Sequence, residues 1–368
     1  MGHCCRLLLL LVAQNFILNC DSLIHQEFKA LSYSKLRQLY AKHYDGYTKF
    51  VAEYKQGVKD DRPEPHRLLA YAKNLEEIKK HNELYKQGKS SFMLGLTVMS
   101  DTSKEDLDDL FPVVVFNETD NPVPPNLTES SIKEVNWVAK NYVTPVKNLF
   151  SYVDCIPTIT TASTVSDVVE AVVKSRTQRL IKLSIQELLD CGGVACNEHV
   201  RFHQYANYIM RNRGMVSERK YPMFNRQQSC GARGRRYGRV KTFLTTVHGE
   251  KLLFKGLLAK RPIATRILLT QKFHNYKGGI FRDCLQSPNN VFSHTVLAVG
   301  FTEDYILLKN RQNWGTKWGE NGYMRISTDP KENCNLYLES FGGNQRELAR
   351  EGNLKKQQQQ KKSQPHQD

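Results

Sequence analysis

Apolar residues recur at helical spacing in three stretches of the chain. Two of them, Leu36–Tyr54 and Arg67–Lys86, lie in an N-terminal region rich in lysine, glutamate, leucine and tyrosine. The third is residues 161–173, where valines stand at positions 165, 168, 169, 172 and 173. Apolar positions three and four residues apart form one face of a helix. We therefore expect two N-terminal helices and a central helix that begins near Cys155.

The pattern changes to strand-like alternation in the C-terminal part. Residues 131–235 are predominantly helical, with Ser184 and Glu187 as a capping box and another helix over His203–Arg213. From residue 236 to 342, short apolar runs alternate with polar residues, most clearly at 240–247, 276–281, 291–301 and 305–323. These patterns predict an α+β fold in which a helical half faces a β half across a groove.

Candidate chemistry lies at the start of the central helix. Cys155 falls in its expected first turn, where the helix dipole lowers the pKa of a thiol, and Pro157 fits the same turn. A thiolate needs a base that is oriented by a third group. His294 stands at the start of one predicted strand, and an amide, Asn310 or Asn313, follows the next. The order cysteine, histidine, amide predicts a thiol hydrolase.

Several motifs together carry a family resemblance. They are T-P-V-K-N (144–148), L-S-I-Q-E-L-L-D-C (183–191), Y-K-G-G-I-F (276–281), S-H-T-V-L-A-V-G-F (293–301) and W-G-T-K-W-G-E-N-G-Y-M-R-I (314–326). With them the chain resembles a papain-family, cathepsin-like cysteine protease precursor. The resemblance implies a two-lobed fold with a helical lobe over 131–235 and a β-barrel-like lobe over 236–342. It implies a monomer that acts on peptides or proteins without a cofactor or metal.

The resemblance also implies roles for single residues. Cys155 becomes the nucleophile, His294 its imidazole partner, and Asn310, in preference to Asn313, the residue that orients His294. Trp314 shields the contact between His294 and the amide. Leu149 stands where the family has the glutamine that donates a hydrogen bond to the oxyanion. Asn197 lies in a degenerate version of the motif that lines the substrate cleft in the family. Cleft glycines are replaced by Phe150, Val153, Glu198 and His199.

The N-terminal helices resemble the inhibitory prosegment of the same family, over residues 26–110. The interrupted spacing of its first motif is matched by Glu64, Tyr71, Asn74, Ile78 and Asn82. Residues 95–101 are a degenerate version of its second motif. Such a segment lies through the cleft, so the resemblance makes the chain's own propeptide its inhibitor. Residues 111–130 are a proline-rich linker with glycosylation sequons at Asn117 and Asn126.

The two ends of the chain predict its destination. Residues 1–20 have the basic start and short apolar runs of a signal peptide, and no uninterrupted run reaches the ~18–20 residues of a membrane span. The chain is therefore expected in the secretory pathway, bound for the lysosome or the extracellular space, with no membrane partner. Residues 343–368 form a Gln/Lys-rich tail that we expect to be disordered.

A net charge of +16 raises the question of an anionic partner. Residues 233–241 and the tail are the basic stretches, but they lack interleaved aromatic residues for stacking on bases. Together with the leader, this favours a solvated face or contact with an anionic polysaccharide over nucleic acid.

Six cysteines follow the predicted leader. The resemblance implies disulfides Cys191–Cys230 and Cys284–Cys334, and leaves Cys155 and Cys196. Cys196 lacks its family partner because that position is Tyr152. Two alternatives stay open. Either Cys155 remains a free nucleophile in an endopeptidase made as a zymogen, or it bonds to Cys196 and the chain is a pseudoprotease that binds peptides or protein partners.

Overall fold

The computed structural model describes most of the propeptide region and most of the two lobes. The described residues are 31–58, 60–110, 132–146, 155–196, 198, 200–224, 226–240, 244–247, 251–284, 292–310, 314–337 and 339–342. The predicted signal peptide, the linker with Asn117 and Asn126, and the C-terminal tail lie outside these residues. Within them, no helix is both long enough and apolar enough to cross a bilayer.

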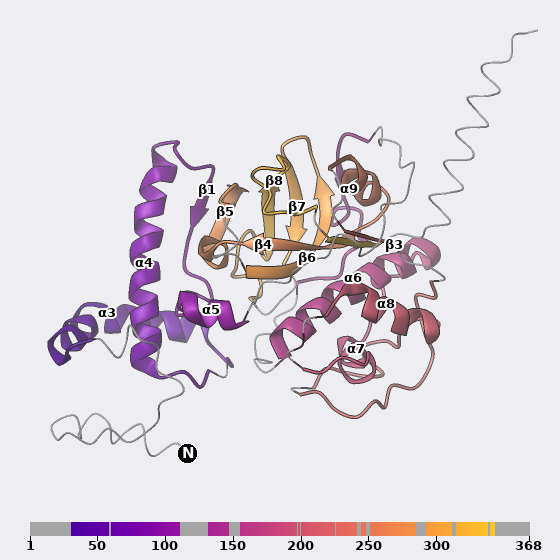
Figure 1. The fold of residues 1–368 in the computed structure, drawn as a ribbon, viewed down its shortest axis with the longest axis horizontal. Helices are drawn as coiled ribbons and strands as arrows, with labels where there is room; N and C mark the ends of the chain where they lie inside the picture. Colours follow the sequence, from indigo (N-terminus) through magenta and orange to yellow (C-terminus); the bar gives the residue numbers. More distant parts are fainter. Residues whose placement is uncertain are drawn as a thin grey trace, which may run out of the picture.

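Two long helices form the N-terminal unit at one end of the molecule (Figure 1). They are α3 (Tyr33–Tyr54) and α4 (Glu64–Lys86), which confirms the helices expected from the periodicity. Their apolar faces meet in a small cluster of Tyr47, Phe50, Leu68 and Tyr71. The short helix α5 (Lys104–Leu110) closes this unit.

Buried charges hold the N-terminal unit together. Lys55 lies 2.7 Å from the fully buried carboxylate of Asp101, and Arg62 lies 2.7 Å from Asp106. Such charges are stable in the interior only when each has a partner. The segment after α4 therefore returns to the base of both helices and is fixed there.

A single sheet runs through the middle of the molecule (Figure 1). Its strand order is β1-β5-β8-β7-β6-β4-β9-β3, and β2 pairs with β6. The strands are β1 (Phe92–Leu94), β2 (Val135–Asn136), β3 (Leu244–Val247), β4 (Ile263–Leu269), β5 (Tyr276–Phe281), β6 (Phe292–Phe301), β7 (Tyr305–Lys309), β8 (Tyr323–Ser327) and β9 (Glu339–Gly342). All except β1 and β2 come from the part of the chain in which strands were expected.

The propeptide contributes β1 to the edge of this sheet. It pairs antiparallel with β5, where Phe92 lies opposite Gly279. Gly279 has a φ of +95°, and a Cβ at this position would stand 2.4 Å from the carbonyl oxygen of Ser91. Only glycine combines this backbone conformation with so close an approach. The glycine therefore lets the propeptide strand dock.

Strand β6 separates two hydrophobic cores. Side chains of successive strand residues point to opposite faces. Val296 and Ala298 accordingly face the core of the β lobe, whereas Leu297 and Val299 face the helical lobe. His294 precedes this alternation on the same strand and has the same parity as Val296.

Within the described residues, helices are found in both lobes. The central helix is α6 (Ile156–Thr177), followed by α7 (Ile185–Cys191) and α8 (Phe202–Arg211). Helix α9 (Lys251–Leu258) and the 3-10 helix η2 (Gln271–Asn275) interrupt the β lobe, where the sequence pattern indicated only strands and turns. The leucines of α9 pack on the β-lobe core, so a tertiary contact decides this element.

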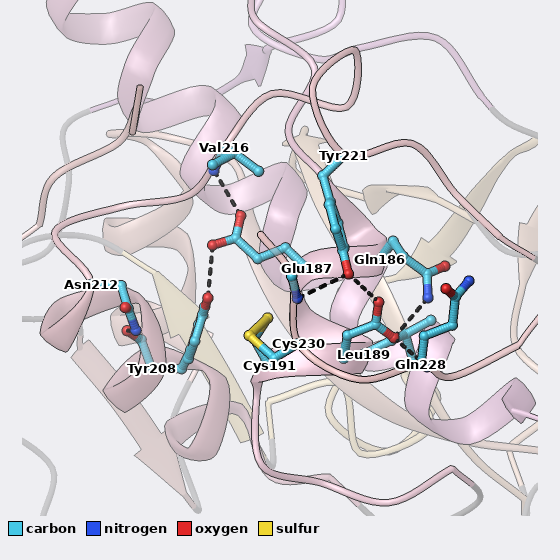
Figure 2. Close-up of a disulfide and its surroundings, with 12 residues drawn as sticks. Gln186, Glu187, Leu189, Cys191, Tyr208, Asn212, Val216, Tyr221, Gln228 and Cys230 are labelled. Carbon is cyan, nitrogen blue, oxygen red and sulfur yellow. Dashed lines mark hydrogen bonds between the residues drawn. A yellow bond between two sulfur atoms is a disulfide. The ribbon is translucent and has the colours of Figure 1, made fainter. Parts of the chain in front are cut away.

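Helix α7 begins with half of the expected capping box. The Ser184 hydroxyl accepts a hydrogen bond from the backbone N–H of Glu187 at 3.0 Å. Figure 2 shows that the Glu187 carboxylate points elsewhere, accepting hydrogen bonds from Tyr208 and from the backbone N–H of Val216. The nearby Cys191–Cys230 disulfide ties the end of α7 to the following loop.

Candidate active site

The expected histidine and amide come together on adjacent strands of the β lobe. The Nε2 atom of His294 in β6 lies 3.2 Å from the Oδ1 atom of Asn310, which directly follows β7. Strands β6 and β7 are antiparallel neighbours, so their pairing brings these side chains together. Asn313, the alternative, lies outside the described residues. Because Asn310 occupies Nε2, a nucleophile would have to approach Nδ1 of the ring.

Aromatic rings enclose His294. Its imidazole stacks on Trp314 with a centroid distance of 5.5 Å and an interplanar angle of 13°, and Phe273 meets it edge-on at 5.4 Å. Trp318 lies behind Trp314 and is fully buried. Only 1% of His294 is exposed. The expected shielding by Trp314 is thus present as ring stacking.

This enclosure changes the protonation of the histidine. Burial lowers the pKa of His294 to about 4; the Asn310 hydrogen bond raises it and the positive charge of Arg266 lowers it further. At neutral pH the imidazole is therefore uncharged. A neutral imidazole can accept a proton, but it cannot hold a thiolate as one half of a resting ion pair.

Cys155 lies at the N-cap of α6, as expected, but it is bonded to Cys196. The two Cα atoms are 4.8 Å apart, within the range that a disulfide spans. Of the two alternatives that the sequence left open for Cys155, the structure contains the bridge to Cys196. The pairs Cys191–Cys230 and Cys284–Cys334 implied by the resemblance are also present.

Contacts of the first turn of α6 explain why Cys155 meets Cys196. The hydroxyl of Thr158 donates to the carbonyl oxygen of Ala195 at 3.3 Å. The loop that carries Cys196 therefore lies against the N-terminal end of this helix. The face of α6 that includes Cys155 points into the helical lobe, where Cys155 belongs to the hydrophobic core.

Helix α6 also contacts the histidine strand. The hydroxyl of Thr164 lies 3.5 Å from that of Thr295, the residue after His294. Cys155, at the N-cap of the same helix, belongs to the hydrophobic cluster that includes Leu297 and Val299 of β6.

A buried polar cluster joins the two lobes beside this contact. Lys309, fully buried at the end of β7, donates to the carbonyl oxygen of Thr144 at 2.5 Å and lies 3.5 Å from the Asp167 carboxylate of α6. The Thr144 hydroxyl donates to Glu170 at 2.7 Å. Since Lys309 immediately precedes Asn310, this cluster fixes the strand end that holds the His294 partner.

The expected substrate-binding residues are only partly described. Trp314 is placed against His294, whereas Leu149 and Asn197 lie outside the described residues. No group of three metal-ligating side chains occurs within the described part of the chain.

Comparisons with known proteins agree on the two regions of the chain. Residues 132–343 match the model of the papain family cysteine proteases, and residues 40–107 match that of the cathepsin propeptide inhibitor domain. Papaya proteinase 4 from Carica papaya is 30% identical over 315 residues, which cover 80% of this chain and 85% of that protein. Cathepsin J from Rattus norvegicus is 29% identical over 290 residues, covering 72% and 82%.

Solved precursor structures share the fold. The digestive procathepsin L 3 of the Tenebrio molitor larval midgut superimposes with a TM-score of 0.67, covering 82% of this chain and 99% of that one at 24% identity. A recombinant stem bromelain precursor gives 0.66 at 23% identity, covering 82% and 98%. At these identities the likeness concerns the fold, including the docked propeptide.

Proposed function

Because the chain belongs to the papain family of cysteine proteases and carries its cathepsin propeptide inhibitor domain, we propose that it is a peptidase-silent member of that family. The Cys155–Cys196 disulfide carries this proposal. A sulfur atom in a disulfide has no thiolate with which to attack a peptide carbonyl.

The remaining role of such a protein is binding. Strand β5 already accepts an extended segment, β1 of the propeptide, through antiparallel pairing. The Ser91 hydroxyl adds a 2.6 Å hydrogen bond to the carbonyl oxygen of Ile280. Addition of a strand to a sheet edge is a general way to bind peptides, in which backbone hydrogen bonds supply the affinity. We propose peptide or protein segments as partners and the chain's own propeptide as the first occupant.

One observation favours a second candidate, a latent thiol endopeptidase. The His294–Asn310 hydrogen bond and the Trp314 stack are retained. If a small thiol reduced the disulfide, the Cys155 thiol would give its proton to the neutral imidazole of His294 and attack a peptide carbonyl, and the imidazolium so formed would protonate the leaving amine. Water would then hydrolyse the acyl-enzyme. The secretory route and the choice between lysosome and extracellular space remain part of both proposals, and the three disulfides support an oxidising compartment.

The two candidates separate in a labelling experiment with a thiol-directed epoxide. The full chain would be cut with an added protease in the segment 111–131 and then labelled with and without reductant. We expect no labelling of the oxidised wild type and no peptide hydrolysis in either state.

Cys155→Ser is the control, because it removes the thiol that the latent endopeptidase would use. Hydrolysis by the reduced wild type that Cys155→Ser abolishes would establish the latent endopeptidase and overturn the silent one.

A further inference from the structure

Positive charge is concentrated in the loop-rich part of the helical lobe. Residues 200–240 contain a single acidic residue, Glu218, and ten basic ones: Arg201, Arg211, Arg213, Arg219, Lys220, Arg226, Arg233, Arg235, Arg236 and Arg239. Not all of these are available to a ligand, because Arg236 pairs with the buried carboxylate of Glu187 and Arg201 with that of Glu339. The excess of basic residues still makes this region strongly positive.

Arginines from three separate segments meet at that end. Arg176 in the last turn of α6 donates a hydrogen bond to the carbonyl oxygen of Arg239. Gly214 packs closely against Arg239, since a Cβ on Gly214 would stand 3.3 Å from the backbone nitrogen of Arg239. Arg213, which precedes Gly214, therefore lies near Arg239. Arg179 follows the C-cap of α6. All four are exposed, and we call Arg176, Arg179, Arg213 and Arg239 the arginine cluster.

The arginine cluster has no acidic partner within the described residues. None of the ion pairs there involves any of its four members. The C-termini of α6 and α8 both end in it, and their dipoles favour positive charge. The helices thus stabilise the four cations without neutralising them, and the cluster keeps its charge for a ligand.

We propose that the arginine cluster binds a sulfated polysaccharide. Guanidinium groups match the oxygen geometry of sulfate, with two parallel hydrogen bonds each. Sulfated polysaccharides occur outside the cell, in the oxidising surroundings that the three disulfides require.

The surroundings of the cluster disfavour single-stranded nucleic acid. Such ligands stack their bases on aromatic side chains. Tyr237, the aromatic residue two positions before Arg239, is covered by the guanidinium of Arg235 at 5.4 Å. Its face is therefore taken by a cation.

The proposed site is separate from the candidate active site. Helix α6 runs over 22 residues, so its C-terminal end lies about 33 Å from the end that carries Cys155. Figure 1 shows the two ends of α6 on opposite sides of the helical lobe. Binding at the arginine cluster and the absence of peptidase activity are thus independent, and one can fail without the other.

The test is the salt concentration at which the full chain elutes from immobilised heparin. The variant Arg176→Gln/Arg213→Gln/Arg239→Gln removes three charges from the cluster. Its matched control, Lys79→Gln/Lys80→Gln/Lys89→Gln, removes three exposed charges from α4 and its end, so both reduce the net charge from +16 to +13. We expect the control to elute at the same salt concentration as the wild type. The cluster variant should elute at a lower one, because the loss of three exposed ionic contacts weakens binding about tenfold.

Three results would overturn the proposal. Equal shifts of both variants would show that net charge alone, and not the cluster, holds the protein on heparin. Displacement of the bound protein by single-stranded DNA at a lower concentration of negative charge than by free heparin would assign the surface to nucleic acid. If the glutamine variant does not fold, the folded Arg176→Lys/Arg213→Lys/Arg239→Lys variant should elute at a lower salt concentration than the wild type, because lysine keeps the charge but loses the two parallel hydrogen bonds. Its elution with the wild type would also overturn the proposal.

Discussion

Removal of the Cys155–Cys196 bridge should destabilise the protein by several kcal/mol. The bond closes a loop with a sequence separation of 41 residues. In the chain-entropy model, cross-linking a loop of this length lowers the entropy of the unfolded chain and stabilises the fold by about 4 kcal/mol at 25 °C. That contribution follows from the cross-link itself and is lost with it. The variant Cys155→Ala/Cys196→Ala therefore measures how far this bond is structural.

The assay is urea unfolding of the oxidised protein. A matched variant, Cys284→Ala/Cys334→Ala, opens a loop with a separation of 50 residues, for which the same model gives about 4 kcal/mol. We expect both variants to lose similar free energies of unfolding, each with a steeper dependence on urea concentration, because the unfolded chain without the cross-link exposes more surface. A loss below about 1 kcal/mol for the Cys155 variant, with a full loss for its control, would refute the structural role of the first bridge.

Three further predictions concern protonation and the propeptide. Burial lowers the pKa of His294 to about 4, below the 6.5 of the unfolded chain, so the unfolded state alone takes up this proton between those values. Stability should fall as pH drops from 6.5, by about 2 kcal/mol at pH 5 from this residue, and His294→Gln should flatten the pH dependence of thermal unfolding. A steeper dependence in the variant would contradict this. Gly279→Ala should detach β1 from β5, since the new Cβ meets the carbonyl of Ser91, and hydrogen exchange at residues 92–94 should rise at least about tenfold. Protection equal to wild type would count against that contact. Finally, intact mass should show the same propeptide content in the wild type and in Cys155→Ser, because a silent enzyme cannot process itself; a difference between them would reveal self-cleavage.

The sequence alone was sufficient for the elements whose signal is local. The valines of residues 161–173 and the alternation at 291–301 predicted α6 and β6, because burial of one face imposes a fixed period on each. The motifs around His294 and Asn310 likewise predicted a contact that the pairing of β6 with β7 provides. Helix α9 was missed because a short apolar run has no period that distinguishes helix from strand.

The tertiary structure decided the partner of Cys155. The valine pattern fixes the buried faces of α6, but it carries no information about the loop that reaches the N-terminal end of the helix. The contact of Thr158 with Ala195 holds that loop against the helix, and Cys196 bonds to Cys155. Both contacts join residues far apart in the chain, and local periodicity says nothing about such pairs. The sequence therefore determined the family and the fold, while only the tertiary structure chose between a free thiol and a disulfide.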